Sequence, residues 1–230
     1  IMIGHTHYPQ NWIHSAYKTK GGNPIYEHVH GAACGAWWSC NMNTNGAPNG
    51  YSLYEIEGNS MKNWVAKGTK NTYDYQMRVY DGNQIYGGTD GNPTGKYRYT
   101  WYGGGVGGSA NIEARGNSSL KGSFVAAVWN DDDLNWKVEF FQNGVKVGDM
   151  KRVSSKIPDI CVVSYFFNNL NKNTTTWTTT TAQHYWYIEA PSGDPTKEKN
   201  WEVRATQTIP GSGEVNVYSC TSLQTDYSGF

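Results

Sequence analysis

Two histidines near the start of the chain are the first residues whose spacing suggests chemistry. His5 and His7 stand in the run Gly4-His5-Thr6-His7, directly after the apolar residues Ile1-Met2-Ile3. A glycine at the end of a strand lets the backbone turn sharply. Imidazoles two residues apart in a loop can reach one metal ion or two neighbouring ions, and Zn, Fe and Mn suit such ligands. The spacing is equally typical of two surface histidines after a strand, so the motif alone leaves both interpretations open.

Two further clusters invite a metal-site interpretation. His28 and His30 fall two residues apart in a predicted strand and would share one face. They either join His5 and His7 in a four-histidine site or are polar residues on a solvated face. The acidic run 131–133 (Asp-Asp-Asp) could offer carboxylate oxygens to Ca²⁺, but the EF-hand spacing and its closing Glu are missing. We therefore expect a solvated β-turn there, with a structural Ca²⁺ site as the alternative. His14 is expected on a loop, without a role.

Composition narrows the function classes. The 230 residues carry 19 Lys plus Arg and 19 Asp plus Glu, a net charge of zero, which argues against nucleic-acid binding. Apolar runs fall far short of the ~20 residues of a membrane helix. The 10 Trp and 17 Tyr favour a folded, strand-rich chain. Most Trp fall in predicted strands, whereas Trp101, Tyr102 and Trp177 lie beside Gly-rich or Thr-rich segments. These three are our candidates for ligand contact, as in a carbohydrate- or peptide-binding module.

The four cysteines leave the redox state open. Cys34, Cys40, Cys161 and Cys220 include no C-x-x-C pair, so a zinc knuckle is not expected. They are either small buried residues or disulfide partners, with Cys34 and Cys40 the nearest pair in the sequence.

The elements that must position these residues are predicted to be almost entirely strands. Helical periodicity is nearly absent, and Gly, Asn and Thr interrupt most of the chain. The N-terminal part contains a strand or strand pair over 26–38 and a hairpin of 51–56 with 60–67, joined by Gly58-Asn59. A series of short strands with turns between them is typical of an antiparallel sandwich. These strands are expected at 75–80, 123–129, 136–142, 145–150, 160–167, 185–189, 201–208 and 214–220.

Several ordered motifs then carry a resemblance to a known family. The motifs are Gly4-His5-Thr6-His7-Tyr8, the run 26–38 (YEHVHGAACGAWW), the run 48–59 (PNGYSLYEIEGN), Val128-Trp129-Asn130 with 136–139, Asn143-Gly144, His184-Tyr185-Trp186 and the run 201–206 (WEVRAT). This series resembles the C-terminal end of secreted bacterial calcineurin-like metallophosphoesterases that have an extra C-terminal domain.

The resemblance implies a specific chemistry and also a gap in it. In that family GHxH is the last metal motif, so His5 and His7 would ligate a dinuclear Mn, Zn or Fe centre whose hydroxide attacks phosphorus. The upstream motifs D-x-H, G-D-x-x-D and G-N-H-D/E do not occur in this chain. We therefore expect the chain to be inactive alone, because two histidines cannot hold a catalytic metal pair.

Together these arguments predict an all-β protein in two parts. Residues 1–80 are expected to be the last strands and hairpin of a metallophosphoesterase catalytic domain, and residues 81–230 an antiparallel β-sandwich accessory domain. The expected partners are an upstream catalytic domain of the same polypeptide and a phosphate ester, with no nucleic acid and no transmembrane segment. The N-terminal strands are expected to dock on the sandwich or to pair between chains. By the resemblance, the protein is secreted, periplasmic or on the cell surface.

Overall fold

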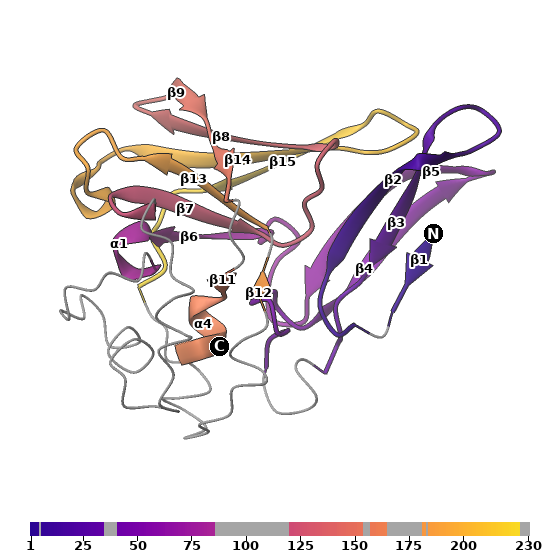
Figure 1. Cartoon of the computed structure of the whole chain (residues 1–230), viewed down its shortest axis with the longest axis horizontal. Coiled ribbons are helices and arrows are strands. Elements are labelled where there is room, and N and C mark those ends of the chain that lie inside the picture. The colour runs from indigo at the N-terminus through magenta and orange to yellow at the C-terminus, as the bar shows by residue number, and fades with distance from the viewer. Residues whose placement is uncertain are drawn as a thin grey trace.

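The computed structural model of the chain shows two antiparallel sheets stacked face to face (Figure 1). It describes residues 1–4, 6–34, 41–85, 120–153, 157–164, 181–182 and 184–225. One sheet has the strand order β10-β13-β7-β6, and the other has the order β15-β14-β8-β9. Their bounds are β6 Met77–Asp81, β7 Ser123–Val128, β8 Trp136–Gln142, β9 Val145–Asp149, β10 Lys151–Arg152, β13 Tyr185–Glu189, β14 Trp201–Thr208 and β15 Val215–Cys220.

The core of this sandwich forms from the inward-facing residues of both sheets. In β14 alternate residues are buried, so Trp201 and Val203 face inward. Phe124 from the opposite sheet packs with its ring centroid 4.7 Å from Phe140 and 4.8 Å from Trp201. Removing such large apolar surfaces from water is the main force that holds two sheets together. The predicted all-β class and antiparallel sandwich are confirmed.

The N-terminal residues form two smaller sheets beside the sandwich (Figure 1). The first has the order β1-β3-β2, with β1 (Met2–Ile3) parallel to β3 (Pro24–Val29) and β2 (Gln10–Lys18) antiparallel to it. The second is the predicted hairpin, formed by β4 (Gly50–Glu57) and β5 (Ser60–Gly68). The sequence prediction missed β2, and His14 lies on that strand with its Nε2 2.8 Å from Glu27. The predicted strand over 26–38 ends at Val29, and residues 35–38 lie outside the described part.

Polar contacts join the hairpin to the sandwich. Asn216 Nδ2 donates to Asn63 Oδ1 at 2.8 Å, and Ser212 Oγ donates to the Lys62 carbonyl at 2.8 Å. The predicted division near residue 80 falls within β6, a strand that pairs with β7 in the sandwich. The division into two domains stays a prediction.

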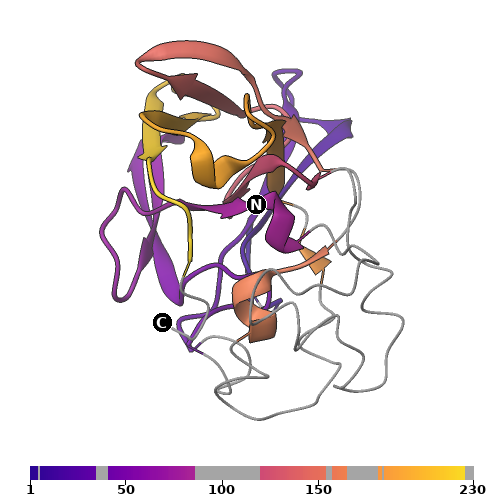
Figure 2. The same cartoon turned by 90° about the vertical axis from the view of Figure 1, so that its left-hand side faces the viewer.

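A short helix covers the outer face of the β6–β7–β13 sheet, below the strands in Figures 1 and 2. Helix α4 (Ile160–Ser164) stands where the sequence predicted a strand over 160–167. A capping side chain explains the difference, because Asp159 Oδ1 accepts hydrogen bonds from the amides of Cys161 (2.9 Å) and Val162 (3.2 Å). An Asp in this position starts a helix by satisfying its first N–H groups. The other short elements are α1 (Gly82–Ile85), β11 (Ile157–Pro158), β12 (Thr181–Ala182) and the 3₁₀ turn η3 (Pro195–Lys197).

Within the described ranges, no helix combines the length and the apolar character needed to cross a membrane.

Candidate functional site

The histidine loop begins where β1 ends. The Ile3 carbonyl accepts a hydrogen bond from the His30 amide at 3.2 Å, which ties this end of the loop to the segment after β3. Thr6 Oγ1 donates to the Tyr8 carbonyl at 3.0 Å. His7 is half-buried and has a φ of 63°, a left-handed conformation that few residues other than glycine adopt. His5 lies outside the described residues, so the structure does not test the predicted pair.

The far end of the loop is held by asparagine side chains. Asn45 Nδ2 donates to the carbonyl of the buried Pro9 at 3.1 Å. Asn11 Nδ2 donates to the carbonyls of Asn130 and of Asp131, the latter at 3.3 Å. Residues 130 and 131 follow strand β7, so these amides attach the loop and the start of β2 to the sandwich. These anchors were not predicted, although an Asn-rich run such as 41–49 is typical of a turn.

His28 fits neither of the two readings that the sequence left open, the four-histidine metal site and the solvated face, whereas His5 lies outside the described residues. His28 is 2% exposed, and both of its ring nitrogens are engaged, Nδ1 2.5 Å from Asn11 Oδ1 and Nε2 3.3 Å from Ser52 Oγ. Its ring also packs on Trp64 at 4.2 Å between centroids. Among the residues that the structure describes, no group of three or more His, Cys, Asp or Glu side chains could hold a metal ion. The described residues therefore do not form a dinuclear metal site by themselves.

The three predicted ligand-contact residues, Trp101, Tyr102 and Trp177, lie outside the described part and stay predictions.

Among the cysteines, Cys161 is a buried thiol with its Sγ 3.4 Å from the Tyr80 hydroxyl. Cys220 is also a thiol. Cys40 lies outside the described residues, so a link between Cys34 and Cys40 is not tested.

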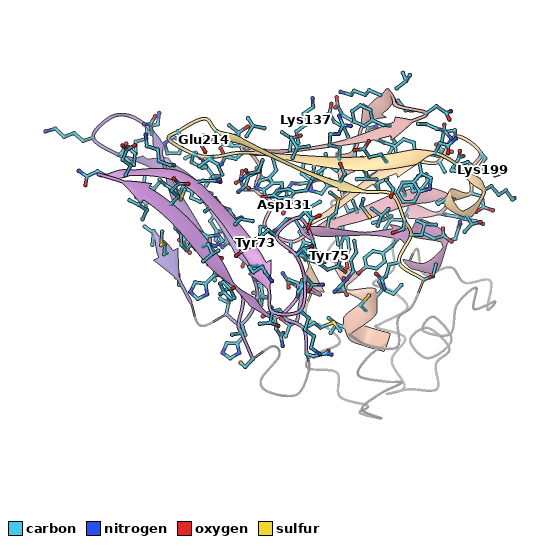
Figure 3. All side chains as sticks on the ribbon, turned by 180° about the vertical axis from the view of Figure 1, so that it is seen from behind. Tyr73, Tyr75, Asp131, Lys137, Lys199 and Glu214 are labelled. Atoms are coloured by element: carbon cyan, nitrogen blue, oxygen red, sulfur yellow. The ribbon has the colours of Figure 1, made fainter. Side chains whose placement is uncertain are left out.

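A cavity of about 340 Å³ lies beside the end of the histidine loop, and its lining begins with Tyr8, the residue that follows His7. One wall is formed by residues 8–13, which end the histidine loop and begin β2. The opposite wall comes from the sandwich and includes the acidic turn 131–133 (Asp131, Asp132 and Asp133), Arg152 and His184. Figure 3 shows Asp131 at this junction between the N-terminal sheets and the sandwich. We call this space the junction cavity.

The prediction that 131–133 is a solvated turn is wrong for two of its three residues. Asp131 is 7% and Asp132 is 3% exposed, and only Asp133 has an open side chain. The carboxylate of Asp132 makes its hydrogen bonds within the turn, because its Oδ1 accepts from the amides of residues 134 (2.8 Å) and 135 (2.6 Å). Its neighbour Asp131 lies 3.0 Å from Arg152 and accepts a hydrogen bond of 2.5 Å from the Trp186 indole. Burial raises the pKa of Asp131 to about 7 even though the positive charge of Arg152 opposes this.

His184 is a buried polar residue on the same wall of the cavity. It is 5% exposed, and its Nε2 has no hydrogen-bond partner. Burial lowers the pKa of His184 to about 3, and the positive charges of Arg152 and Arg78 lower it further. The imidazole is therefore neutral at ordinary pH, and one of its nitrogens faces no protein partner.

The fold and the loop together define a β-sandwich domain that carries a histidine loop on a small sheet at its side. A family model described as the C terminal of calcineurin-like phosphoesterase matches residues 27–210, so the chain belongs to this family. Comparisons with curated proteins and with solved structures give no match. The matched range begins after the histidine loop and crosses residue 80.

Proposed function

We propose that this chain is the C-terminal accessory part of a secreted, metal-dependent phosphoesterase whose full-length form hydrolyses phosphate esters. Family membership supports the accessory role. In this proposal His5 and His7 supply ligands to a dinuclear centre of Mn, Zn or Fe, and an upstream catalytic domain supplies the remaining ligands. The described residues do not complete such a centre, so no step of the hydrolysis is assigned to side chains of this chain.

The exposed edge of β1 is the observation that carries the proposal. The apolar residues Ile1, Met2 and Ile3 are 65%, 53% and 39% exposed, although two of them form a strand. On one side β1 pairs with β3, and in the described part its other edge has no neighbouring strand. An exposed apolar strand edge is a template for another strand. A strand of an upstream catalytic sheet would cover this edge and would place the next loop, with its histidines, at the rim of that sheet.

The accessory role we propose is to hold the histidine loop. The loop leaves β1 and is fixed at its other end by hydrogen bonds from Asn45 to Pro9 and from Asn11 to residues 130 and 131. Ligand side chains need supporting contacts that fix their orientation. The sandwich supplies such contacts from one side, while the catalytic domain would supply the metals from the other.

The test compares the chain alone with a longer form that includes the upstream reading frame. Both are assayed with Mn, Zn or Fe on p-nitrophenyl phosphate and on its bis-ester. We expect metal-dependent turnover only in the longer form, and its loss in a His5→Ala/His7→Ala double variant. His14→Ala is the matched control, because His14 lies on β2 with a partly exposed side chain in contact with Glu27 and should leave turnover unchanged. Turnover by the chain alone, or full activity of the double variant, would contradict the proposal.

A further inference from the structure

The sheet formed by β1, β3 and β2, which we call the N-terminal sheet, depends little on buried side chains. Among the described residues of 1–30, only Pro9, His28 and Val29 are buried, and no residue of β2 is. By contrast, every residue of β6 and of β7 is buried in the sandwich. A segment with few buried contacts opens at a lower free energy than the core of the same protein. The N-terminal sheet is therefore the part that should open before the sandwich does.

His28 joins this sheet to its neighbours. The pairing of His28 with Asn11 places both side chains on one face of the sheet. His28 Nδ1 donates to Asn11 Oδ1 at 2.5 Å, and Nε2 therefore accepts from the Ser52 hydroxyl of β4 at 3.3 Å. The ring packs on Trp64 of β5 with 4.2 Å between centroids. Asn11 in turn donates to the carbonyls of residues 130 and 131 of the sandwich. One side chain thus links the sheet to the hairpin directly and to the sandwich through Asn11.

These contacts require a neutral imidazole. His28 is 2% exposed, and none of the contacts that the structure describes for it is a carboxylate. A charge there would be buried without a compensating partner, which is costly. Burial lowers the pKa of His28 to about 3, and the nearby His30 and N-terminal ammonium add to this effect. An exposed imidazole has a pKa of about 6.5. Below that pH, opening that exposes His28 takes up one proton, so acid favours the open form.

The other titratable groups at this interface contribute no net proton. On β4 and β3, Tyr54 and Tyr26 stay neutral because burial raises their pKa values. On the sandwich wall of the junction cavity, burial raises the pKa of Asp131 to about 7 and lowers that of His184 to about 3. If opening hydrates both, Asp131 releases the proton that His184 takes up below about pH 5.5. The remaining charged residues that line the cavity are Asp132, Asp133 and Arg152. The net uptake on opening is therefore the one proton of His28.

We propose that the N-terminal sheet is a pH-sensitive element, which separates from the hairpin and the sandwich as His28 takes up a proton while the sandwich stays folded. Because one proton is taken up, the equilibrium constant for opening should rise about tenfold for each pH unit below about pH 5.5. At neutral pH the closed form keeps the histidine loop against the sandwich, since Asn45 holds Pro9. The proposal concerns residues of this chain alone and does not rest on the proposed function.

The test is amide hydrogen exchange of the 230-residue chain, resolved by residue, between pH 7 and pH 4.5. Each rate is corrected for the intrinsic exchange rate at that pH, which gives the opening constant of each amide. We expect larger opening constants for the amides that pair β2 with β3 than for those of β8 and β14. From pH 5.5 to 4.5 the β2–β3 constants should rise about tenfold. Equal opening constants in the N-terminal sheet and in β14, or β2–β3 constants that do not change with pH, would overturn the proposal.

Two variants assign the proton. His28→Gln keeps a donor and an acceptor but does not titrate, so the rise should shrink to less than about twofold. His14→Gln is the matched control, because His14 lies on the opposite face of the same sheet in contact with Glu27, and it should keep the full rise. If His28→Gln fails to fold, NMR of the unaltered chain gives a second measurement, in which the His28 ring should not titrate above about pH 4. A full rise in His28→Gln, or a His28 midpoint near pH 6.5 in the folded chain, would contradict the proposal.

Discussion

A single methyl group at Gly46 should destabilise the protein far more than the same change at another left-handed glycine. Gly46 has a φ of +87°, and a Cβ built on it would lie 2.2 Å from Cγ and 2.4–2.5 Å from the carboxylate oxygens of Asp159. Gly58 has a φ of +59° with nothing within 4 Å of the added Cβ. Gly58→Ala therefore measures backbone strain alone, about 1–2 kcal/mol. Gly46→Ala adds a collision with a fully buried side chain.

The hydrogen bonds of Asp159 set the size of the extra cost. Its carboxylate accepts from the hydroxyls of Tyr80 (3.0 Å) and Tyr185 (2.7 Å) and from two backbone amides of α4. Bonds to a charged group contribute about 1.5–3 kcal/mol each. If the displaced carboxylate loses two of its four bonds, the loss is at least ~3 kcal/mol beyond the strain. Together with the strain, two lost bonds give an expected cost of about 4–8 kcal/mol for Gly46→Ala, a large part of a typical total of about 5–15 kcal/mol.

Urea unfolding of both variants, monitored by circular dichroism, measures the difference. The background Asp159→Ala sharpens the test, because it removes the three atoms that the new Cβ would meet. In that background Gly46→Ala should cost only the strain, so the two substitutions should show coupling of several kcal/mol. Equal destabilisation by Gly46→Ala and Gly58→Ala, or additivity of Gly46→Ala with Asp159→Ala, would refute this reasoning.

Three further predictions concern pH, association and the loop anchors. Burial lowers the pKa values of His28 and His184 to about 3, so unfolding takes up about two protons between about pH 5.5 and 4.5, a window below the ordinary His pKa, while Asp131, with a pKa raised by burial to about 7, releases about one. Stability should thus fall by ~1.4 kcal/mol per unit as the pH drops, and by twice that in Asp131→Asn, as urea unfolding across this window would measure; an unchanged slope contradicts the assignment. Met2→Lys, at the exposed edge of β1, should reduce self-association of the chain in light scattering, whereas a clean monomer at high concentration would argue against such association. Asn45→Ala should lower stability by about 1–2 kcal/mol and increase amide hydrogen exchange over residues 6–8, and unchanged exchange there would contradict the anchoring role.

The sandwich could be predicted from the sequence because its strands carry their own signals. The hairpin β8–β9 follows from Asn143-Gly144, where φ values of 51° and 78° match the turn type that this pair prefers. Alternation in β14 likewise marks its buried face. Helix α4 could not be predicted this way, because an apolar, β-branched run reads as a strand. What starts the helix is Asp159, a single capping residue whose effect depends on the buried tyrosines that hold its carboxylate.

The candidate site was less predictable because its parts are distant in the chain. Asn11 and Asp131 are 120 residues apart, and no local pattern relates an amide in β2 to an acidic turn of the sandwich. The acidic run also misled the prediction, since three consecutive Asp usually lie in water. Here Asp131 instead lies against Arg152 and Trp186, contacts that form only when β13 pairs with β7 and β10 pairs with β13.

The turn around Gly46 connects residues of the sandwich to the end of the histidine loop. The turn around Gly46 packs on Asp159, and its carbonyl accepts a hydrogen bond of 2.6 Å from the buried Arg78 of β6. Its neighbour Asn45 holds Pro9, two residues after His7. Because a close-packed interior transmits displacement, a change that moves Asp159 should reach the histidine loop through this turn. In the metal-dependent full-length protein that we propose, Gly46→Ala should thus lower metal affinity as well as stability, whereas Gly58→Ala should lower stability alone.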